Sequence, residues 1–368
     1  MTTTVEDIKA RTSELLAEQS YFVTHQVQVG DQLFNQFVNA DSTLIELLQK
    51  GRSHGEKECM VYEGDRWTYD DFYEKSDAVN YMLQEKMKVE AGSRVAIAMR
   101  NYPEWGACFF GAVFSGAMVV PLNSWGKKEE LLFGIRDSGC RVLVCDQQRF
   151  DLIKDHVGEL DVSIVVARNS GELPDAKNIY CLSDELEFAK GKLAPSVSVD
   201  TDDSVLMLYT SGSTGTPKGV PLTHRAVCQA MMNYFYGGAL TVALDGADED
   251  APEQAANLLC VPLFHGTGLF AGLLVAIAMG FKTVMMYKWD PVEALKLVEQ
   301  EKITQTNAVP ALVQALLSCD RFDEFDTSSL KRVGTGGAAS PTTLPQLVRA
   351  KLKNPVCGTG WGMTETCV

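Results

Sequence analysis

YTSGSTGTPKGV, residues 209–220, directly follows the apolar run 205–208 and is the most informative stretch of this 368-residue chain. The apolar run predicts a short buried strand. The glycines of the segment allow a sharp turn, so that successive backbone N–H groups can point at an anion. Hydroxyl side chains add donors and a lysine adds a positive charge, whereas a flexible surface turn would need only a few of these residues. We therefore predict a phosphate-binding loop, with these candidate ligands: Thr210, Ser211, Gly212, Ser213, Thr214, Gly215 and Lys218.

The position of the lysine separates this loop from a Walker A loop. A Walker A lysine opens a helix, whereas Lys218 follows Pro217 and precedes Gly219, Val220 and another proline. We therefore expect no helix to begin at the lysine. The order [ST]-G-[ST]-T-G-x-P-K-G instead resembles the adenylate-forming superfamily, which includes acyl-CoA synthetases, luciferases and the adenylation domains of peptide synthetases.

Composition narrows the class of protein. The length and 46% hydrophobic residues allow two domains with real cores. A net charge of −15 disfavours nucleic acid and anionic lipid as partners. Ten cysteines without a C-x-x-C pair predict a reducing, cytoplasmic location, and no secretory signal opens the chain. The most apolar stretch, 269–281, is too short to span a bilayer and predicts a buried helix.

Strand-like and helix-like segments alternate along most of the chain, which predicts an α/β fold with mainly parallel sheets. A polar connection at 192–203 suggests two subdomains, 1–200 and 201–368, the second carrying the phosphate loop. The predicted strands of the first are 95–99, 117–122, 141–146 and 162–167, and those of the second are 256–263, 282–287, 304–309 and 330–335.

The resemblance begins near residue 67 and continues to the last residue. It implies two stacked α/β subdomains, as in the N-terminal part of acyl-CoA synthetases, where a small β-barrel and a mobile C-terminal lid complete the protein. The T-G-D segment and the lid lysine of that family have no match in this sequence. We therefore expect a truncated synthetase without its lid, the alternative being a short protein that cannot complete adenylation alone. In this 368-residue form we expect at most weak binding of ATP and acid.

The segment PLFHGTG, 262–268, places His265 in a glycine-containing turn after an apolar run. A lone histidine is commonly a surface or core residue. In acyl-CoA synthetases and luciferases, however, the histidine of a P-x-x-H segment lines the acyl or aryl pocket. Peptide-synthetase domains carry an aspartate near this segment to pair with the α-ammonium group of the substrate. No aspartate is present here, which favours an acid without an amino group. The resemblance implies an acid pocket shaped by His265, Gly266, Leu269, Ala311 and Gly337.

A second glycine-rich turn, GTGGAAS at 334–340, meets the G-x-G-x-x-A pattern of dinucleotide-binding folds. That pattern also needs an acidic residue about 20 positions later, and no Asp or Glu lies between Thr327 and Thr364. A dehydrogenase is therefore disfavoured. The resemblance assigns Gly336, Gly337 and Ala338 to the ATP site, where a bare backbone can approach adenine and the acyl group.

The last motif, GTGWGMTET at 358–366, combines an aromatic ring that can stack on a purine with a hydroxyl and a carboxylate. A carboxylate beside an anion site is expected to hold a cation, and Mg²⁺ prefers oxygen ligands. The motif resembles the family's G-Y-G-x-T-E, with Trp361 in place of the tyrosine. It implies a metal site at Thr210 and Glu365, and ATP contacts from Gly360, Trp361, Gly362, Met363 and Thr364.

Together the motifs predict an acid–thiol ligase. A carboxylate, with a fatty acid preferred, attacks the α-phosphorus of ATP, pyrophosphate leaves, and coenzyme A then displaces AMP. The resemblance gives catalytic roles to Thr210, Lys218 and Glu365, with ATP, Mg²⁺, coenzyme A and a small carboxylic acid as partners. The alternatives are a luciferase-like or aryl acid ligase and a non-catalytic nucleotide-binding or scaffold protein; the sequence leaves a homodimer open.

Overall fold

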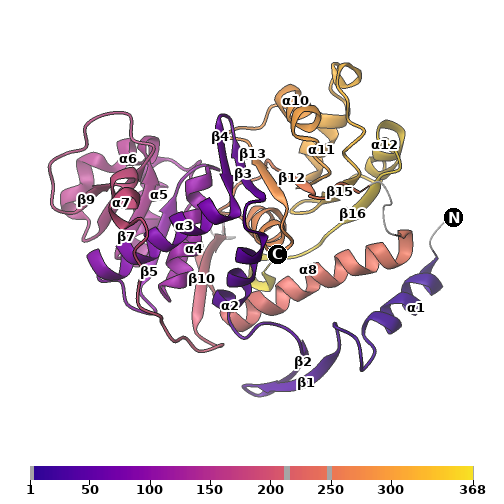
Figure 1. The fold of residues 1–368 in the computed structure, drawn as a ribbon, viewed down its shortest axis with the longest axis horizontal. Coiled ribbons are helices and arrows are strands. Elements are labelled where there is room, and N and C mark those ends of the chain that lie inside the picture. The colour runs from indigo at the N-terminus through magenta and orange to yellow at the C-terminus, as the bar shows by residue number, and fades with distance from the viewer. Residues whose placement is uncertain (1–3, 211–215, 247–250, 368) are drawn as a thin grey trace.

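Two seven-stranded sheets, each covered by helices, form most of the molecule (Figure 1). The computed structural model describes residues 4–210, 216–246 and 251–367. Both sheets are parallel except for one antiparallel pair at an edge of each. The predicted α/β class with two mainly parallel sheets is therefore confirmed.

The first sheet has the strand order β11-β10-β6-β5-β7-β8-β9. Its side chains alternate between two cores, so that Val95 and Ile97 join one and Ala96 and Ala98 join the other. This alternation is expected of strands that are buried on both faces. The strands are β5 (Arg94–Ala98), β6 (Met118–Pro121), β7 (Val142–Asp146), β8 (Ser163–Ala167), β9 (Ile179–Cys181), β10 (Ser204–Thr210) and β11 (Lys218–Thr223).

Helices on both faces of the first sheet create these two cores. Thr68 starts helix α3 (Tyr69–Tyr81) with a capping box, in which its hydroxyl accepts a hydrogen bond from the N–H of Asp71. Helix α3 packs closely against α4 (Pro103–Phe114), because a Cβ on Gly111 of α4 would lie 2.6 Å from atoms of Val79 on α3. The helices are α3 (Tyr69–Tyr81), α4 (Pro103–Phe114), α5 (Lys128–Ser138), α6 (Gln147–Ile153) and α7 (Leu182–Ala189).

The second sheet has the strand order β16-β15-β14-β12-β13-β3-β4. The stretch 269–281, predicted as a buried helix, is mostly helical and mostly buried: the π-helical segment η4 (Thr267–Leu274) continues directly into α9 (Val275–Ala278). The strands are β3 (Glu58–Tyr62), β4 (Asp65–Thr68), β12 (Ala256–Leu259), β13 (Lys282–Met285), β14 (Gln305–Ala308), β15 (Arg332–Thr335) and β16 (Val356–Thr359). The remaining helices are α8 (His224–Asp245), α10 (Pro291–Glu301), α11 (Pro310–Leu317) and α12 (Leu344–Lys351).

The two sheets exchange segments of chain across residue 200. Strands β3 and β4 come from 58–68 but lie in the second sheet, whereas β10 and β11 come from 204–223 but lie in the first. The sheets therefore do not coincide with the expected units 1–200 and 201–368. Local patterns identify strands, but long-range pairing decides which sheet each strand joins.

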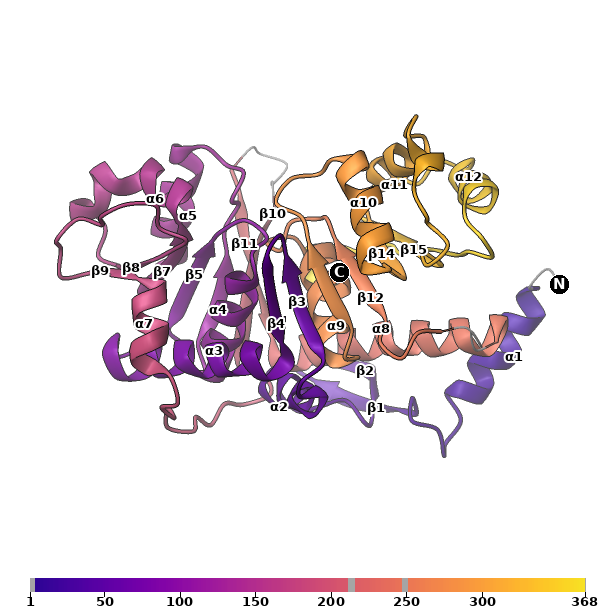
Figure 2. The same cartoon turned by 45° about the horizontal axis from the view of Figure 1, so that its top comes forward.

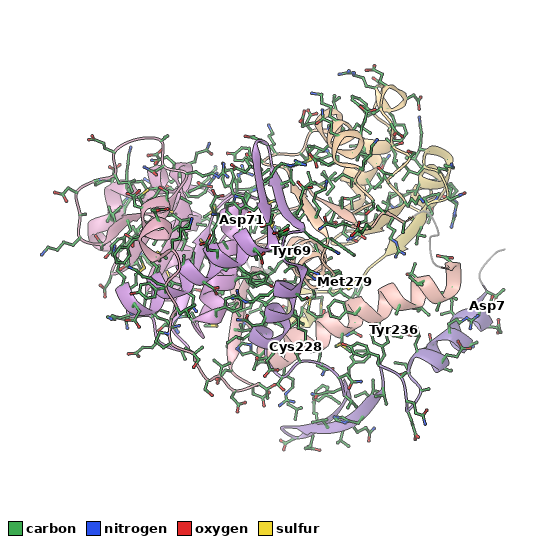
Figure 3. The ribbon with its side chains drawn as sticks, in the orientation of Figure 1. Asp7, Tyr69, Asp71, Cys228, Tyr236 and Met279 are labelled. Carbon is green, nitrogen blue, oxygen red and sulfur yellow. The ribbon has the colours of Figure 1, made fainter. Side chains whose placement is uncertain are left out.

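The N-terminal region packs against α8. Helix α1 (Val5–Leu15) lies alongside α8 in both views, and the hairpin of β1 (Thr24–Val29) and β2 (Gln32–Phe37) lies below it (Figures 1 and 2). The hydroxyl of Tyr236 on α8 donates to Thr12 at 3.0 Å (Figure 3). Within the described part of the chain, no helix is both long enough and apolar enough to cross a membrane.

His224 at the start of α8 fixes the short helix α2 (Leu44–Gln49). Its Nδ1 accepts a hydrogen bond of 3.0 Å from the N–H of Leu44, and the ring is buried. Burial lowers the pKa of His224 from its ordinary value of 6.5. Protonation would remove the acceptor that α2 uses, so the folded protein requires the neutral ring.

We expect His224 to make stability depend on pH. A lowered folded-state pKa means that the unfolded chain binds the proton more readily, so this stability is complete above 6.5 and falls as pH drops below it. His224→Asn keeps an acceptor near Leu44 but cannot titrate. Urea unfolding between about pH 7.5 and 5.5 should show a shallower loss in the variant than in the parent, both of which retain His265. Parallel curves would contradict this role.

Candidate functional site

The phosphate-loop segment is held between the two strands of a hairpin. Thr210 ends β10 and pairs with Lys218, the first residue of β11, and its hydroxyl lies 3.5 Å from the Lys218 carbonyl oxygen. The prediction that no helix begins at the lysine is confirmed. Lys218 is exposed, so its charge is open to a ligand. The expected ligands 211–215 (Ser211, Gly212, Ser213, Thr214 and Gly215) lie outside the described residues.

The stem of this hairpin is fixed by packing and one short hydrogen bond. A Cβ on Gly219 would lie 2.8 Å from the Met207 sulfur, so a larger residue there would require the Met207 side chain to shift. The Tyr209 hydroxyl donates to the Asp137 carboxylate on α5 at 2.6 Å. Burial and, after it, this carboxylate raise the pKa of Tyr209, so the hydroxyl stays protonated. Tyr209, the residue before Thr210, is thereby anchored to α5, which covers the first sheet.

The two glycine-rich turns lie side by side at the carboxyl edge of the second sheet. The Gly336 N–H donates to the Ala308 carbonyl at 3.2 Å, and the Gly360 N–H donates to Thr335 at 2.7 Å. A Cβ on Gly336 would lie 3.5 Å from the Gly360 carbonyl oxygen. Ligands of open α/β sheets bind outside the carboxyl ends of the strands, so the backbone here is placed where a ligand can approach it.

Gly337 connects these turns to the segment that carries the histidine. Its φ of +74° is in the left-handed region that favours glycine. A Cβ at this position would lie 3.5 Å from the Thr267 hydroxyl and 3.5 Å from Val309. Ala338 is exposed in the same turn, and Ala311 is exposed in the first turn of α11, just after Val309.

His265 lies in the irregular segment between β12 and η4. Its ring centroid is 4.4 Å from that of Phe264, and its side chain remains open to solvent. Partial desolvation nevertheless lowers the pKa of His265, so the ring is neutral at pH 7. Gly266 and Leu269 follow, but Leu269 is fully buried in the core and presents no open surface.

The carboxylate motif lies beside the phosphate-loop hairpin. The short 3₁₀ helix η6 (Thr364–Thr366) packs next to β10 and β11, the strands that end at Thr210 and begin at Lys218. Glu365 and Trp361 are exposed, the latter by 81%. Gly362 and Met363 connect them. The segment of Glu365 therefore lies against the strands that flank the predicted phosphate loop.

The two predicted magnesium ligands, Glu365 and Thr210, carry oxygen atoms of the kind that Mg²⁺ prefers. Among the described residues, no group of three or more His, Cys, Asp or Glu could hold a metal ion. Because Mg²⁺ keeps several waters and binds substrate phosphates, one or two protein ligands would be enough for an ion that arrives with a nucleotide.

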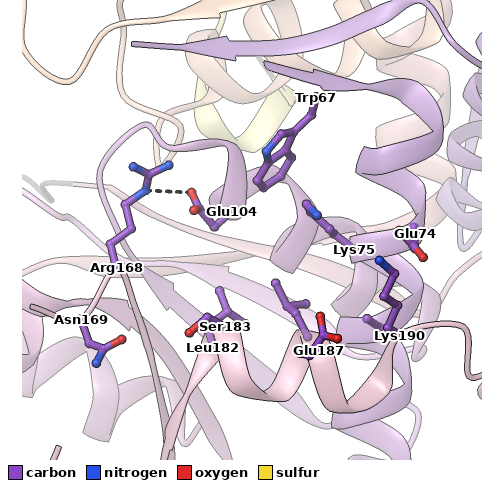
Figure 4. A pocket seen from close by; sticks show the side chains of 12 residues that line it. Trp67, Glu74, Lys75, Glu104, Arg168, Asn169, Leu182, Ser183, Glu187 and Lys190 are labelled. Carbon is purple, nitrogen blue, oxygen red and sulfur yellow. Dashed lines mark hydrogen bonds and ion pairs between the residues drawn. The ribbon is translucent and has the colours of Figure 1, made fainter. Parts of the chain in front are cut away.

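A separate pocket of about 410 Å³ is lined by none of the motif residues, and sequence reasoning did not predict it (Figure 4). Arg168 donates to Glu104 at 3.0 Å on one side, and the Lys75 ammonium lies 5.0 Å from the centre of the Trp67 ring. Lysines and glutamates both line it, so its charge does not select a ligand of one sign. The remaining lining residues are Glu74, Ala78, Asn169, Leu182, Ser183, Leu186, Glu187 and Lys190.

Sequence reasoning also missed the residues that join the two sheets. The Arg100 guanidinium stacks between Trp125 at 4.5 Å and Tyr287 at 5.1 Å. The buried side chain of Asn101 forms hydrogen bonds with the segment that leads to His265. The sequence carried a signal for these residues, because the polar residues Arg100 and Asn101 follow the apolar run 95–99.

Comparison with known proteins identifies relatives of the chain. Residues 47–368 match the family described as AMP-binding enzyme. The chain is 30% identical to 4-coumarate–CoA ligase 2 of Petroselinum crispum over 318 residues, covering 84% of this chain and 55% of that protein. It is 31% identical to 4-coumarate–CoA ligase of Vanilla planifolia over 281 residues, covering 76% and 49%. The chain thus spans about half the length of the curated relatives it matches.

Solved structures agree with the fold. The N-terminal domain of FACL13 from Mycobacterium tuberculosis superimposes with a TM-score of 0.72 at 25% identity, covering 88% of this chain and 77% of that one. The anthranilate–CoA ligase AuaEII in complex with anthranoyl-AMP gives a TM-score of 0.77 at 23% identity, covering 89% and 61%. The latter likeness concerns the fold alone.

We expect Gly268→Ala to destabilise the protein. A Cβ there would lie 2.2 Å from the Pro262 carbonyl oxygen, which is backbone and cannot rotate away. The free energy of unfolding in urea should fall by about 1–3 kcal/mol. The control is Gly237→Ala in α8, where nothing lies within 4 Å, and it should raise stability by about 0.5–1 kcal/mol. Equal effects of the two changes would contradict the close contact.

Proposed function

Because the chain belongs to the AMP-binding enzyme family, we propose that it binds ATP and a carboxylic acid for adenylation and thioester formation with coenzyme A. One observation carries the proposal. The segment of Glu365 packs beside β10 and β11, the strands that flank the predicted phosphate loop at Thr210 and Lys218. In the proposal, the loop supplies donors for phosphates and Glu365 supplies a carboxylate for a cation.

The chemistry is displacement at phosphorus. A carboxylate oxygen forms a bond to the α-phosphorus of ATP, the bond from that phosphorus to the bridging oxygen breaks, and pyrophosphate leaves. Such a transfer needs positioning and neutralised charge more than covalent help from the protein. Magnesium, held by Glu365 and Thr210, would supply charge neutralisation at the phosphates. The thiol of coenzyme A then attacks the acyl carbon, and AMP leaves.

Each motif has a place in this proposal. Lys218 and the loop bind the β- and γ-phosphates, and Trp361 stacks on adenine, which its exposure permits. Gly336, Gly337 and Ala338 let the nucleotide approach the backbone. His265 borders the acid pocket as a neutral ring, and it therefore provides no charge that would select a second ionic group on the acid.

The acid is proposed to be hydrophobic and to lack an amino group. A fatty acid is the first candidate. The motif forms at His265 and Met363 resemble those of acyl-CoA synthetases and luciferases rather than those of peptide synthetases, which supports an acid without an amino group. An aryl acid is the second, since curated relatives at 30–31% identity are 4-coumarate–CoA ligases. A non-catalytic nucleotide-binding protein remains the alternative from another class.

Lys218→Ala should weaken ATP binding about tenfold or more, because a charge-assisted contact to phosphate contributes about 1.5–3 kcal/mol. Titration calorimetry with ATP and Mg²⁺ measures this directly. Lys177→Ala removes an exposed lysine near β9, far from the hairpin, and should leave the affinity unchanged. The same affinity in all three proteins would refute the assignment of the loop.

A panel of acids tests the substrate class. Octanoate, palmitate, 4-coumarate, benzoate and phenylalanine would be titrated into protein saturated with AMP. We expect binding of fatty or aryl acids and none of phenylalanine, whose ammonium group would have no carboxylate partner in the segment 262–268. Preferential binding of the amino acid would overturn the proposed class.

A further inference from the structure

The segment 260–265, which leads from β12 to His265, has no regular secondary structure. Strand β12 ends at Leu259, so the polar groups of the following residues have no partner in the sheet ladder. Val261 and Leu263 are nevertheless buried, and buried backbone groups without a partner are costly. Some other group must therefore hold this segment in place.

That group is the side chain of Asn101, which lies just after strand β5 of the first sheet. Its Nδ2 donates to the Val261 carbonyl at 2.8 Å, and its Oδ1 accepts from the Leu263 N–H at 3.1 Å. The side chain is 7% exposed, so both bonds are shielded from water. An asparagine amide has an NH₂ group that donates and an oxygen that accepts, and it thus takes the place of a neighbouring strand for this segment.

The same backbone is also confined by its close approach to Gly268. A Cβ on Gly268 would lie 2.2 Å from the Pro262 carbonyl oxygen and 3.1 Å from that of Val261. The His265 N–H donates to Pro262 at 3.2 Å, so the histidine follows directly from the confined peptide. Asn101 itself is held, because the Arg100 N–H donates to the buried Asp146 carboxylate at 3.0 Å.

We propose that Asn101 is a positioning residue for the acid site: it fixes the segment 261–263, and with it His265, relative to the first sheet. The inference rests on the proposed function, in which His265 borders the acid. Asn101 reaches the acid site only through the 261–265 backbone, whereas the phosphate-loop hairpin is anchored independently through Tyr209 and Asp137. Loss of the Asn101 contacts should therefore weaken acid binding selectively and leave nucleotide binding intact.

Asn101→Asp is the test variant, since it changes one donor into an acceptor without changing size. At about pH 8 the carboxylate would face the Val261 carbonyl oxygen, and we expect acid affinity to fall about tenfold. Burial and this repulsion raise the pKa of the new carboxyl group. Near pH 6 the protonated group again offers one donor and one acceptor, so affinity should recover relative to the parent at the same pH.

The measurements are titrations of octanoate and 4-coumarate into AMP-saturated protein, and of ATP with Mg²⁺ into free protein. Asn178→Asp is the matched control, because Asn178 also donates to a carbonyl, that of Val162 at 3.0 Å, but lies at the far edge of the first sheet. It should leave both affinities unchanged. Asn101→Ser, whose short hydroxyl cannot replace both bonds, should show a pH-independent loss of acid affinity and serves if the aspartate variant does not fold.

The outcomes separate the inference from the proposed function. If the parent protein binds neither acid, the proposed function fails, and the inference with it. If the parent binds acid and both Asn101 variants bind it equally well, only the inference is overturned. An equal loss of ATP and acid affinity would also overturn it, because Asn101 would then support the fold in general.

Discussion

Parallel pairing in the second sheet is the constraint on which the candidate site depends. β12, β14, β15 and β16 run in one direction and in register, so each leaves the sheet at the same edge. Three segments with different sequences therefore meet there: the histidine segment, the glycine turn and the tryptophan motif. If β12, β15 or β16 were reversed, the segment that follows it would leave at the opposite edge and would not meet the other two.

The site also requires that the two sheets keep a fixed relation, and few polar contacts provide it. Tyr69 at the start of α3 donates to the Phe281 carbonyl at 2.9 Å, next to β13 (Figure 3). Arg168, at the end of β8, forms ion pairs with Asp65 of β4 and Glu104 of α4. Asn101 adds the contact nearest to the site. Apolar packing holds the sheets together, and these directional bonds set their alignment.

Much of the fold could be predicted from the sequence, because its strands and helices carry strong local patterns. The strand before the predicted phosphate loop, the absence of a helix at Lys218 and the glycine-rich turn at Gly336 could be predicted from the residues. The placement of β3 and β10 could not be predicted, since strand pairing depends on contacts between distant residues. Leu269 shows the same limit: its position in a motif indicates proximity to the pocket, but its burial depends on packing. The roles of site residues remain proposals.

The hairpin that bounds the phosphate segment has a consequence for how an anion would be attracted. In loops that lead into a helix, the aligned peptide dipoles add a fixed positive field that needs no mobile charge. Here strand β11 begins at Lys218, so no helix that starts at this lysine adds such a field, and the exposed ammonium of Lys218 would attract an anion instead. An exposed charge is screened over about 8–10 Å at physiological ionic strength, and the chain carries a net charge of −15. If Lys218 binds phosphate as proposed, its attraction for a nucleotide should be short-ranged and sensitive to salt.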